Sequence, residues 1–252
     1  MYESVCYKKS FLKEVILRID FPSPLPGHEK LLPSSISKVI LKAFPIMETQ
    51  QVQEQKLQFS GSNISAESKE VTQWIFYGKE REKSILLMPN SISITTKNYK
   101  SFEDLLSDVS DIFGEFFKLY PELGASRVGL RFINVLDPEG NDPLSWSEYV
   151  DEKMLGIIDF HNEEHLTRVF HILEYNYDGQ AIKYQFGIAN PDFPALIKRK
   201  QFVLDIDSSF NGIFNLTEIM QNIEESHVKI QELFEKSITD KTKELMEPVP
   251  NV

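Results

Sequence analysis

Two long segments with helical periodicity, each following a group of short strand-like segments, constrain the fold of this chain most. Residues 101–119 are the clearer of the two, because apolar side chains recur every three or four positions after a capping signal at Ser101 and Asp104. Residues 216–234 repeat this helical spacing near the C-terminus. The strand-like segments that precede them are 74–77, 84–88 and 92–96 in the first case, and 166–177, 180–188 and 202–210 in the second.

This order predicts an α+β fold in which long amphipathic helices pack on one face of antiparallel sheet, not a doubly wound parallel sheet. Asp178-Gly179 supports antiparallel pairing, because glycine accepts the positive φ that a two-residue hairpin turn requires. Since the order occurs twice, it also predicts two similar halves. The turn-rich segment 138–143 separates them, so we expect halves 1–137 and 144–252 that pack as one compact unit.

Shorter patterns predict the remaining elements from local alternation, capping residues and turn residues. These are a strand at 14–21, a short helix from Ser34 or Ser35 to Phe44, a weak strand at 50–59, a polar loop at 60–68, a strand at 127–132, and a short final helix after a capping signal at 237–240.

Composition and charge exclude several classes of protein. The 252 residues are 41% hydrophobic and 12% aromatic, which is enough for a large core and argues against a disordered chain. The net charge of −11, from 27 basic and 38 acidic residues, argues against nucleic acid as a general partner, because such binding depends on Lys and Arg replacing counterions. The short basic run 198–200 is expected to be a solvated turn.

Cys6 is the single cysteine, and it excludes an intramolecular disulfide framework or a zinc site built from several thiolates. One cysteine fits a reducing compartment better than a secreted protein. No stretch approaches the roughly 18 to 20 apolar residues that a membrane span needs. The N-terminus also has charged residues where a signal peptide would be apolar. We therefore expect a cytoplasmic protein without a membrane partner.

Residues 161–165 read His-Asn-Glu-Glu-His, which matches the H-x-x-E-H pattern of inverted zincins. Zinc chemistry would need both histidines one turn apart on a helix, with a glutamate as general base and a third ligand elsewhere. Because the flanking segments are β-prone, we do not expect the imidazoles of His161 and His165 to converge. The sequence therefore predicts no metal site and no cofactor, and leaves open only weak metal binding by Asp159, Glu163 and His171.

Two carboxylates share one face of the strand predicted at 202–210. Asp205 and Asp207 alternate with apolar residues and lie about 7 Å apart on an extended chain. Such a pair could hold Mg²⁺ together with substrate phosphates, because hard cations prefer oxygen ligands. A simple polar outer face is the competing interpretation, and it is favoured because no glycine-rich phosphate loop accompanies the pair.

Two arginines share one face of the strand predicted at 127–132. Arg127 and Arg131 lie four residues apart with Gly129 between them, and guanidinium groups bridge carboxylates or grip phosphate. We expect at least one contact between Arg131 and Glu14, Asp205 or Asp207, because charges of both signs on neighbouring strands are most cheaply accommodated as pairs. His227 lies on the apolar stripe of the last long helix, so a partly buried structural histidine is expected.

Four segments together resemble a sporadically distributed bacterial family of uncharacterised proteins of similar length: residues 11–19, 127–134 and 202–207, and His227 followed by Phe234 and 237–240. The resemblance spans nearly the whole chain, and the family has no known activity that could be transferred to this chain. Its sporadic distribution implies a mobile gene with a role in defence or a toxin-antitoxin system. The hallmark positions of the family map to Glu14, Arg131, Asn134, Asp205, Asp207, His227, Thr239 and Asp240.

The sequence favours a non-enzymatic interaction protein, because it contains no complete catalytic constellation. We expect another protein as the partner, and a homodimer stays open. The alternative is a metal-dependent, nuclease-like toxin or defence component that uses Asp205 and Asp207 with Arg131. A third class is a ligand-binding module with a pocket between sheet and helices.

Overall fold

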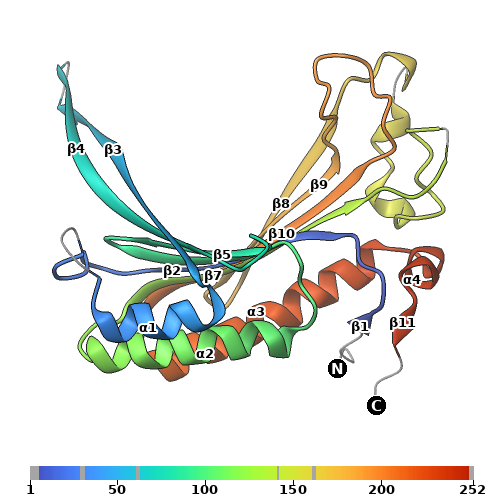
Figure 1. The fold of residues 1–252 in the computed structure, drawn as a ribbon. Coiled ribbons are helices and arrows are strands. Elements are labelled where there is room, and N and C mark those ends of the chain that lie inside the picture. Colours follow the sequence, from blue (N-terminus) through green and yellow to red (C-terminus); the bar gives the residue numbers. More distant parts are fainter. Residues whose placement is uncertain (1–5, 29–31, 61–62, 141, 161–162, 250–252) are drawn as a thin grey trace. The chain divides into compact units, whose positions relative to one another are not determined.

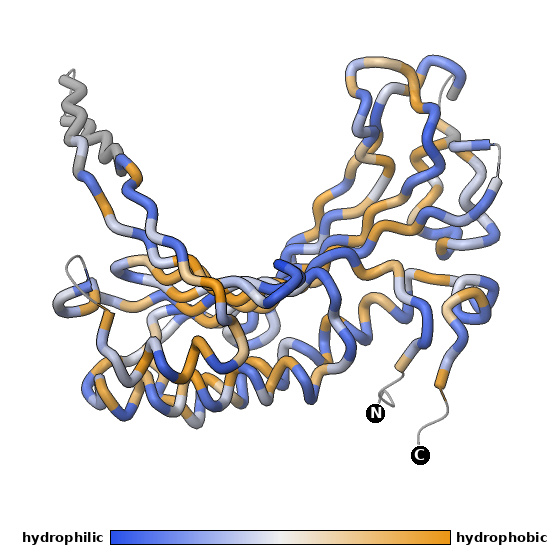
Figure 2. The backbone as a smooth tube through the Cα atoms, in the orientation of Figure 1, coloured by the Kyte–Doolittle hydropathy of each residue, from blue (hydrophilic) through white to orange (hydrophobic). Residues whose placement is uncertain are grey.

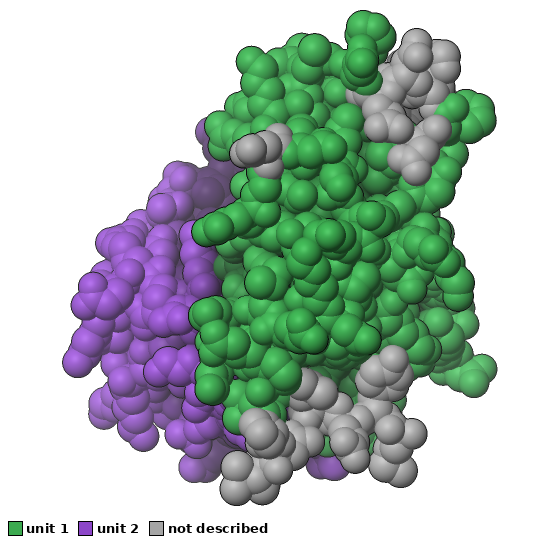
Figure 3. All heavy atoms as spheres, turned by 90° about the vertical axis from the view of Figure 1, so that its right-hand side faces the viewer, with its two compact units in different colours: residues 1–15, 129–211, 220–252 green, residues 16–128, 212–219 purple. Residues whose placement is uncertain are grey.

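The computed structural model describes residues 6–28, 32–60, 63–140, 142–160 and 163–249. The chain divides into two compact units, shown in different colours in Figure 3. Unit 1 comprises residues 1–15, 129–211 and 220–252, and unit 2 comprises 16–128 and 212–219. The expected α+β class is confirmed, because antiparallel strands and long helices make up both units.

In each unit a long helix, α2 or α3, follows a group of strands (Figure 1). The strands are β1 Cys6–Tyr7, β2 Leu12–Asp20, β3 Ile46–Ser60, β4 Asn63–Tyr77, β5 Lys83–Met88, β6 Ser91–Thr96, β7 Ala125–Leu136, β8 Val169–Tyr177, β9 Gln180–Ile188, β10 Phe202–Phe214 and β11 Pro248–Val249. The α-helices are α1 Ser34–Ala43, α2 Phe102–Leu119, α3 Leu216–Ser237 and α4 Asp240–Met246. The described residues also form short 3₁₀ turns, η1 Glu152–Met154, η2 Ile158–Phe160 and η3 Glu163–His165.

In unit 2, the strands follow the order β3-β4-β5-β6-β2, and α1 and α2 lie on one face of them (Figure 1). The predicted helix at 101–119 is confirmed as α2, and the Ser101 side chain accepts a hydrogen bond from the Asp104 amide. Apolar and polar residues alternate along α2 (Figure 2), and its apolar stripe is buried. Phe116 of this stripe stacks on Phe21, with ring centroids 5.2 Å apart.

The predicted polar loop at 60–68 is wrong, because β4 begins at Asn63. The weak strand expected at 50–59 is longer than predicted, and β3 pairs with β4 in antiparallel register from Ile46 opposite Tyr77 to Ser60 opposite Asn63. Backbone groups make this ladder, so polar side chains do not prevent it. Hydrophobic alternation reports burial of one face, which explains why it could not find this polar ribbon.

In unit 1, the strands follow the order β7-β10-β9-β8, and α3 covers one face of them. The hairpin predicted at Asp178-Gly179 is confirmed, since both residues have positive φ (49° and 101°) and Tyr177 lies opposite Gln180. Ile223 and Ile230 of α3 are buried in the core of this unit. The Ser208 hydroxyl of β10 donates to Ser226 of α3 over 2.9 Å, which ties strand to helix inside that core.

The two units repeat one connectivity. In unit 2, β2 is followed by a crossover to the far edge at β3, a meander that returns at β6 beside β2, and then α2. In unit 1, β7 is followed by a crossover to the far edge at β8, a meander that returns at β10 beside β7, and then α3. The repeated order predicted from the sequence is therefore present in the chain's topology. The units differ in extent from the expected halves 1–137 and 144–252.

Candidate functional site

Three of the charged candidates, Arg131, Asp205 and Asp207, lie on the side of the unit 1 sheet opposite α3. Directly opposed residues of antiparallel strands share a face, and the register places Asp205 opposite Gln185 and Asp207 opposite Lys183. Glu174 of β8 lies opposite Lys183 in turn. Together with Arg131 of β7, these side chains define what we call the polar face: Arg131, Glu174, Lys183, Gln185, Asp205 and Asp207.

An ion pair between Arg131 and Asp205 is the centre of the polar face. Arg131 Nε donates to Asp205 Oδ1 over 2.7 Å, and Nη2 donates to Oδ2 over 2.6 Å. The Asp205 side chain is only 8% exposed, whereas that of Arg131 is 39% exposed. The hydrogen bonds to Asp205 raise the pKa of Arg131, and the negative charges of Asp205, Asp207 and Glu14 raise it further. Partial burial of the guanidinium lowers this pKa, but by less. The predicted contact of Arg131 with a carboxylate is therefore confirmed.

This pairing changes what the two carboxylates can do chemically. Both oxygens of Asp205 accept a hydrogen bond from Arg131, and Gln185 Nε2 lies a further 3.5 Å from Oδ2. A metal ion would have to displace this bidentate contact from a buried carboxylate. Across the described ranges, no group of three or more His, Cys, Asp or Glu side chains is placed to hold a metal ion. The geometry therefore supports an ion-paired, structural Asp205.

Asn134 and His227 belong to the other side of the unit 1 strands. Asn134 is buried, and its Nδ2 donates to the Leu204 carbonyl over 3.5 Å. The His227 ring of α3 lies 5.9 Å from the Phe132 ring, between centroids. Because side chains alternate along β7, Phe132 and Asn134 point away from the face that carries Arg131. The structure therefore does not bring these two candidates together with the ion pair.

Thr239 and Asp240 lie at the N-terminus of α4 in unit 1. The Thr239 hydroxyl accepts a hydrogen bond from the Thr242 amide and donates one to the Glu148 carbonyl oxygen over 2.5 Å. Asp240 occupies the first turn, where a carboxylate favours the positive end of the helix dipole. The capping signal predicted at 237–240 is thus confirmed. Both residues have a structural place in this helix.

Arg127, the remaining arginine candidate, belongs to unit 2. Its Nη1 atom lies 3.8 Å from Asp20 Oδ2, and the same carboxylate accepts a 2.8 Å contact from Arg18. The two guanidinium groups therefore neutralise one aspartate on β2.

The H-x-x-E-H motif falls only partly within the described residues, because 161 and 162 lie outside them. Glu163–His165 form a three-residue 3₁₀ turn, and β8 begins four residues later at Val169. The motif therefore precedes a strand, as expected, and its described part lacks the helical turns that a zincin site requires.

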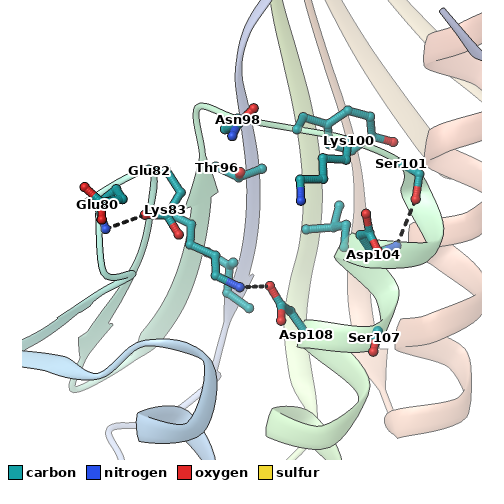
Figure 4. A pocket seen from close by; sticks show the side chains of 13 residues that line it. Glu80, Glu82, Lys83, Thr96, Asn98, Lys100, Ser101, Asp104, Ser107 and Asp108 are labelled. Atoms are coloured by element: carbon teal, nitrogen blue, oxygen red, sulfur yellow. Dashed lines mark hydrogen bonds and ion pairs between the residues drawn. The ribbon is translucent and has the colours of Figure 1, made fainter. Parts of the chain in front are cut away.

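A pocket of about 470 Å³ opens on unit 2 between the β5-β6 hairpin and the start of α2 (Figure 4). Most of its lining residues carry polar or charged side chains, and several of these groups interact with one another. Lys83 Nζ contacts Asp108 Oδ2 at 2.5 Å, and Ser101 caps the Asp104 amide. Small-molecule pockets are generally apolar and enclosed with few polar groups, so this one gives little support to the ligand-binding alternative.

The feature that sequence reasoning missed is the exposure of β8. Antiparallel pairing to β9 covers one edge, and no strand of the described chain pairs with the other. None of the nine residues of β8 is buried, although six are aliphatic or aromatic. Ile172 is 55% exposed, and Leu173 and Tyr177 are each 41% exposed. The available signal was the run Val-Phe-His-Ile-Leu, which is apolar on both faces and does not alternate.

A loop between β9 and β10 extends this apolar area. Asn190 Nδ2 donates to the Thr167 and Ala195 carbonyls, over 2.7 and 2.8 Å, and this fixes the loop beside the residues that lead into β8. The Arg168 guanidinium lies 4.2 Å from the centroid of the exposed Phe193 ring. We call the combined area the β8 surface, and it comprises Phe170, Ile172, Leu173, Tyr177, Phe193 and Leu196.

No protein-family model matches this chain, and a search of curated proteins likewise found no match. The resemblance to a sporadically distributed bacterial family therefore stays a prediction. Within the described residues, the helices are too short or too polar to cross a membrane.

Proposed function

We propose that this protein is a non-enzymatic bacterial interaction protein that binds another polypeptide through the β8 surface. The observation that carries the proposal is the exposure of β8. This strand lies at the edge of the sheet, and none of its nine residues is buried. A cytoplasmic setting is part of the proposal and is supported by the single, exposed and unpaired Cys6.

An edge strand presents a row of backbone N–H and C=O groups that another chain can pair with. Proteins usually protect such edges with Lys, Pro or a bulge, and β8 contains neither Lys nor Pro and carries one charge, at Glu174. The edge strand of unit 2, β3, is by contrast rich in Gln and charged residues. Exposed apolar side chains beside a bare edge are typical of a surface that a partner covers, by strand addition.

The polar face supports binding over catalysis. Its buried carboxylate, Asp205, is held by Arg131 in a bidentate contact, so a metal ion could use the expected Asp205 and Asp207 pair only by displacing Arg131. Charged groups around an apolar centre give a protein contact its specificity rather than its affinity. Lys183 and Glu174 provide such groups next to Ile172.

The test is affinity capture from the source cells with three tagged forms of the protein. Leu173→Lys alters the β8 surface, and Val228→Lys is its matched control, because Val228 is 57% exposed on α3. We expect one protein to be recovered with wild type and Val228→Lys, to be lost with Leu173→Lys, and to bind again when the purified components are mixed. Equal recovery with all three forms would contradict a role for β8.

The same proteins distinguish the enzymatic alternative. Nucleic acid incubated with wild type and Mg²⁺ should remain intact. Cleavage that disappears in a folded Asp207→Asn variant would refute the binding proposal and favour a metal-dependent nuclease that uses the polar face.

A further inference from the structure

We infer that the polypeptide that covers β8 is β8 of a second copy of this chain, paired antiparallel about a two-fold axis at Leu173. This inference rests on the proposed function, because it names the occupant of the same surface. The strand has nine residues, Val169–Tyr177, and Leu173 is its central residue. With a two-fold axis through Leu173, each of the nine residues of one β8 strand would therefore lie opposite a residue of the other.

The register about Leu173 is self-complementary. Residue numbers of opposed positions add to the same total, so Leu173 faces Leu173 of the second copy and His171 faces its Tyr175. On the same side of the sheet, Val169 faces Tyr177. Apolar and aromatic cross-strand pairs of this kind stabilise antiparallel ladders. The two-fold axis is perpendicular to the sheet, so side chains stay on their own faces.

The charge distribution favours this edge for a contact between identical chains. The protein carries a net charge of −11, so two copies repel each other over most surfaces. The β8 edge contributes one carboxylate, Glu174, which in this register faces Ile172 of the second copy. Lys183 lies opposite Glu174 within each copy and offsets its charge. No like charges are therefore directly opposed.

The contact made by one edge strand is expected to be small. A ladder of nine residues covers a strip about 30 Å long. Such a strip lies at the small end of specific protein interfaces, which bury about 1,200 to 2,000 Å² in total. We therefore expect a reversible dimer with a micromolar dissociation constant, rather than an obligate one. Tyr177 is held at the end of the strip by Lys229, whose Nζ lies 4.5 Å from the ring centroid.

Disulfide trapping tests the register directly, because Cys6 is the single native cysteine and can be replaced by Ser. In that background, Leu173→Cys places two thiols in directly opposed positions, close enough for a disulfide. Tyr177→Cys is the matched control, since both residues are 41% exposed on one face of β8. The two control thiols would lie about eight residues apart along the ladder, far beyond disulfide reach.

We expect mild oxidation to convert most of the Leu173→Cys protein to a covalent dimer and to leave the Tyr177→Cys protein monomeric. Sedimentation of the Cys6→Ser parent should show its mass doubling with concentration, and Leu173→Lys should abolish that doubling, because it places two like charges directly opposite each other. Equal cross-linking of both cysteine variants would overturn the register. A monomeric parent without specific Leu173→Cys cross-linking would overturn the second copy as occupant. Loss of a different captured protein in Leu173→Lys would then still support the proposed function.

Discussion

At the scale of single residues, carboxylates on the strands form ion pairs with arginines, and these carboxylates differ in how deeply they are buried. Asp205 is almost fully buried and relies on Arg131, whose own side chain is partly exposed. Asp20 is less buried and receives both Arg18 and Arg127. The sequence predicted that Arg131 would contact a carboxylate, because charges of both signs lay on neighbouring strands. It could not choose among Glu14, Asp205 and Asp207, since strand register depends on contacts far apart in the chain.

Arg131→Ala should destabilise the protein by about 1 to 3 kcal/mol, measured as the free energy of unfolding in urea. The buried Asp205 carboxylate would lose its bidentate partner. Because the Arg131 side chain is partly exposed to solvent, the loss of stability should be smaller than for a fully buried ion pair. Arg131→Lys keeps the positive charge but loses the bidentate geometry of the guanidinium group, so it should destabilise the protein less than Arg131→Ala. The double variant Arg131→Ala with Asp205→Asn should recover part of the stability, because it leaves no unpaired buried charge. A change within about 0.5 kcal/mol for Arg131→Ala would contradict a structural role.

Tyr7 gives the protein a predicted loss of stability at alkaline pH. Its hydroxyl donates to the buried Glu235 over 2.6 Å, and Lys243 lies 3.4 Å from the other carboxylate oxygen. Burial, the Glu235 hydrogen bond and the Glu235 charge raise the pKa of Tyr7 in the folded state. A raised folded pKa means that the stabilisation is complete below the ordinary tyrosine value of about 10 and is lost as pH rises above it.

Wild type should therefore exceed Tyr7→Phe in free energy of unfolding by about 1 kcal/mol at neutral pH, since Tyr7 is only half-buried. The difference should shrink above about pH 10. Denaturant titrations of both proteins at several pH values measure it. A difference that stays constant through the alkaline range would show that the hydroxyl does not carry this pH dependence.

At the scale of elements, the reliability of prediction followed the kind of signal. The α2 helix and the β8-β9 hairpin were predicted correctly, because the first has a wide apolar stripe with a cap and the second has a turn that only certain residues favour. The β3-β4 ribbon was missed in part because its pairing is made by the backbone. The N-terminus of α3 was predicted without its reciprocal cap between Asn215 and Glu218, a signal that was readable in the sequence.

The α2 helix should be intolerant of charge on its apolar stripe. Phe113 is fully buried there, so Phe113→Asp should unfold the protein, as it removes a large apolar contact and buries a carboxylate. Leu119→Asp on the same helix is the control, and it should retain near wild-type stability because Leu119 is exposed. Thermal unfolding followed by circular dichroism measures both. A cooperative transition at the wild-type temperature in Phe113→Asp would mean that this face of α2 is not a core face.

At the scale of the whole molecule, the topology decides where the chain is exposed. Each meander begins at a far edge, so β3 and β8 are the edge strands of their units. A sequence pattern reports whether a segment is a strand, but an edge position follows from strand order, which is set by distant pairings. The candidate site was therefore predictable only as far as the ion pair. The β8 surface emerged from the order of strands and from the exposure of its side chains.

Hydrogen exchange of the intact protein, followed by mass spectrometry at dilute and concentrated conditions, tests most directly whether β8 is a contact surface. Outer backbone amides of β8 have no strand to pair with in a single copy and should exchange quickly when the protein is dilute. At high concentration, exchange over residues 169–177 should slow several-fold, while exchange over the other edge strand, 46–60, should stay unchanged. Equal exchange of residues 169–177 at both concentrations would contradict a self-paired β8.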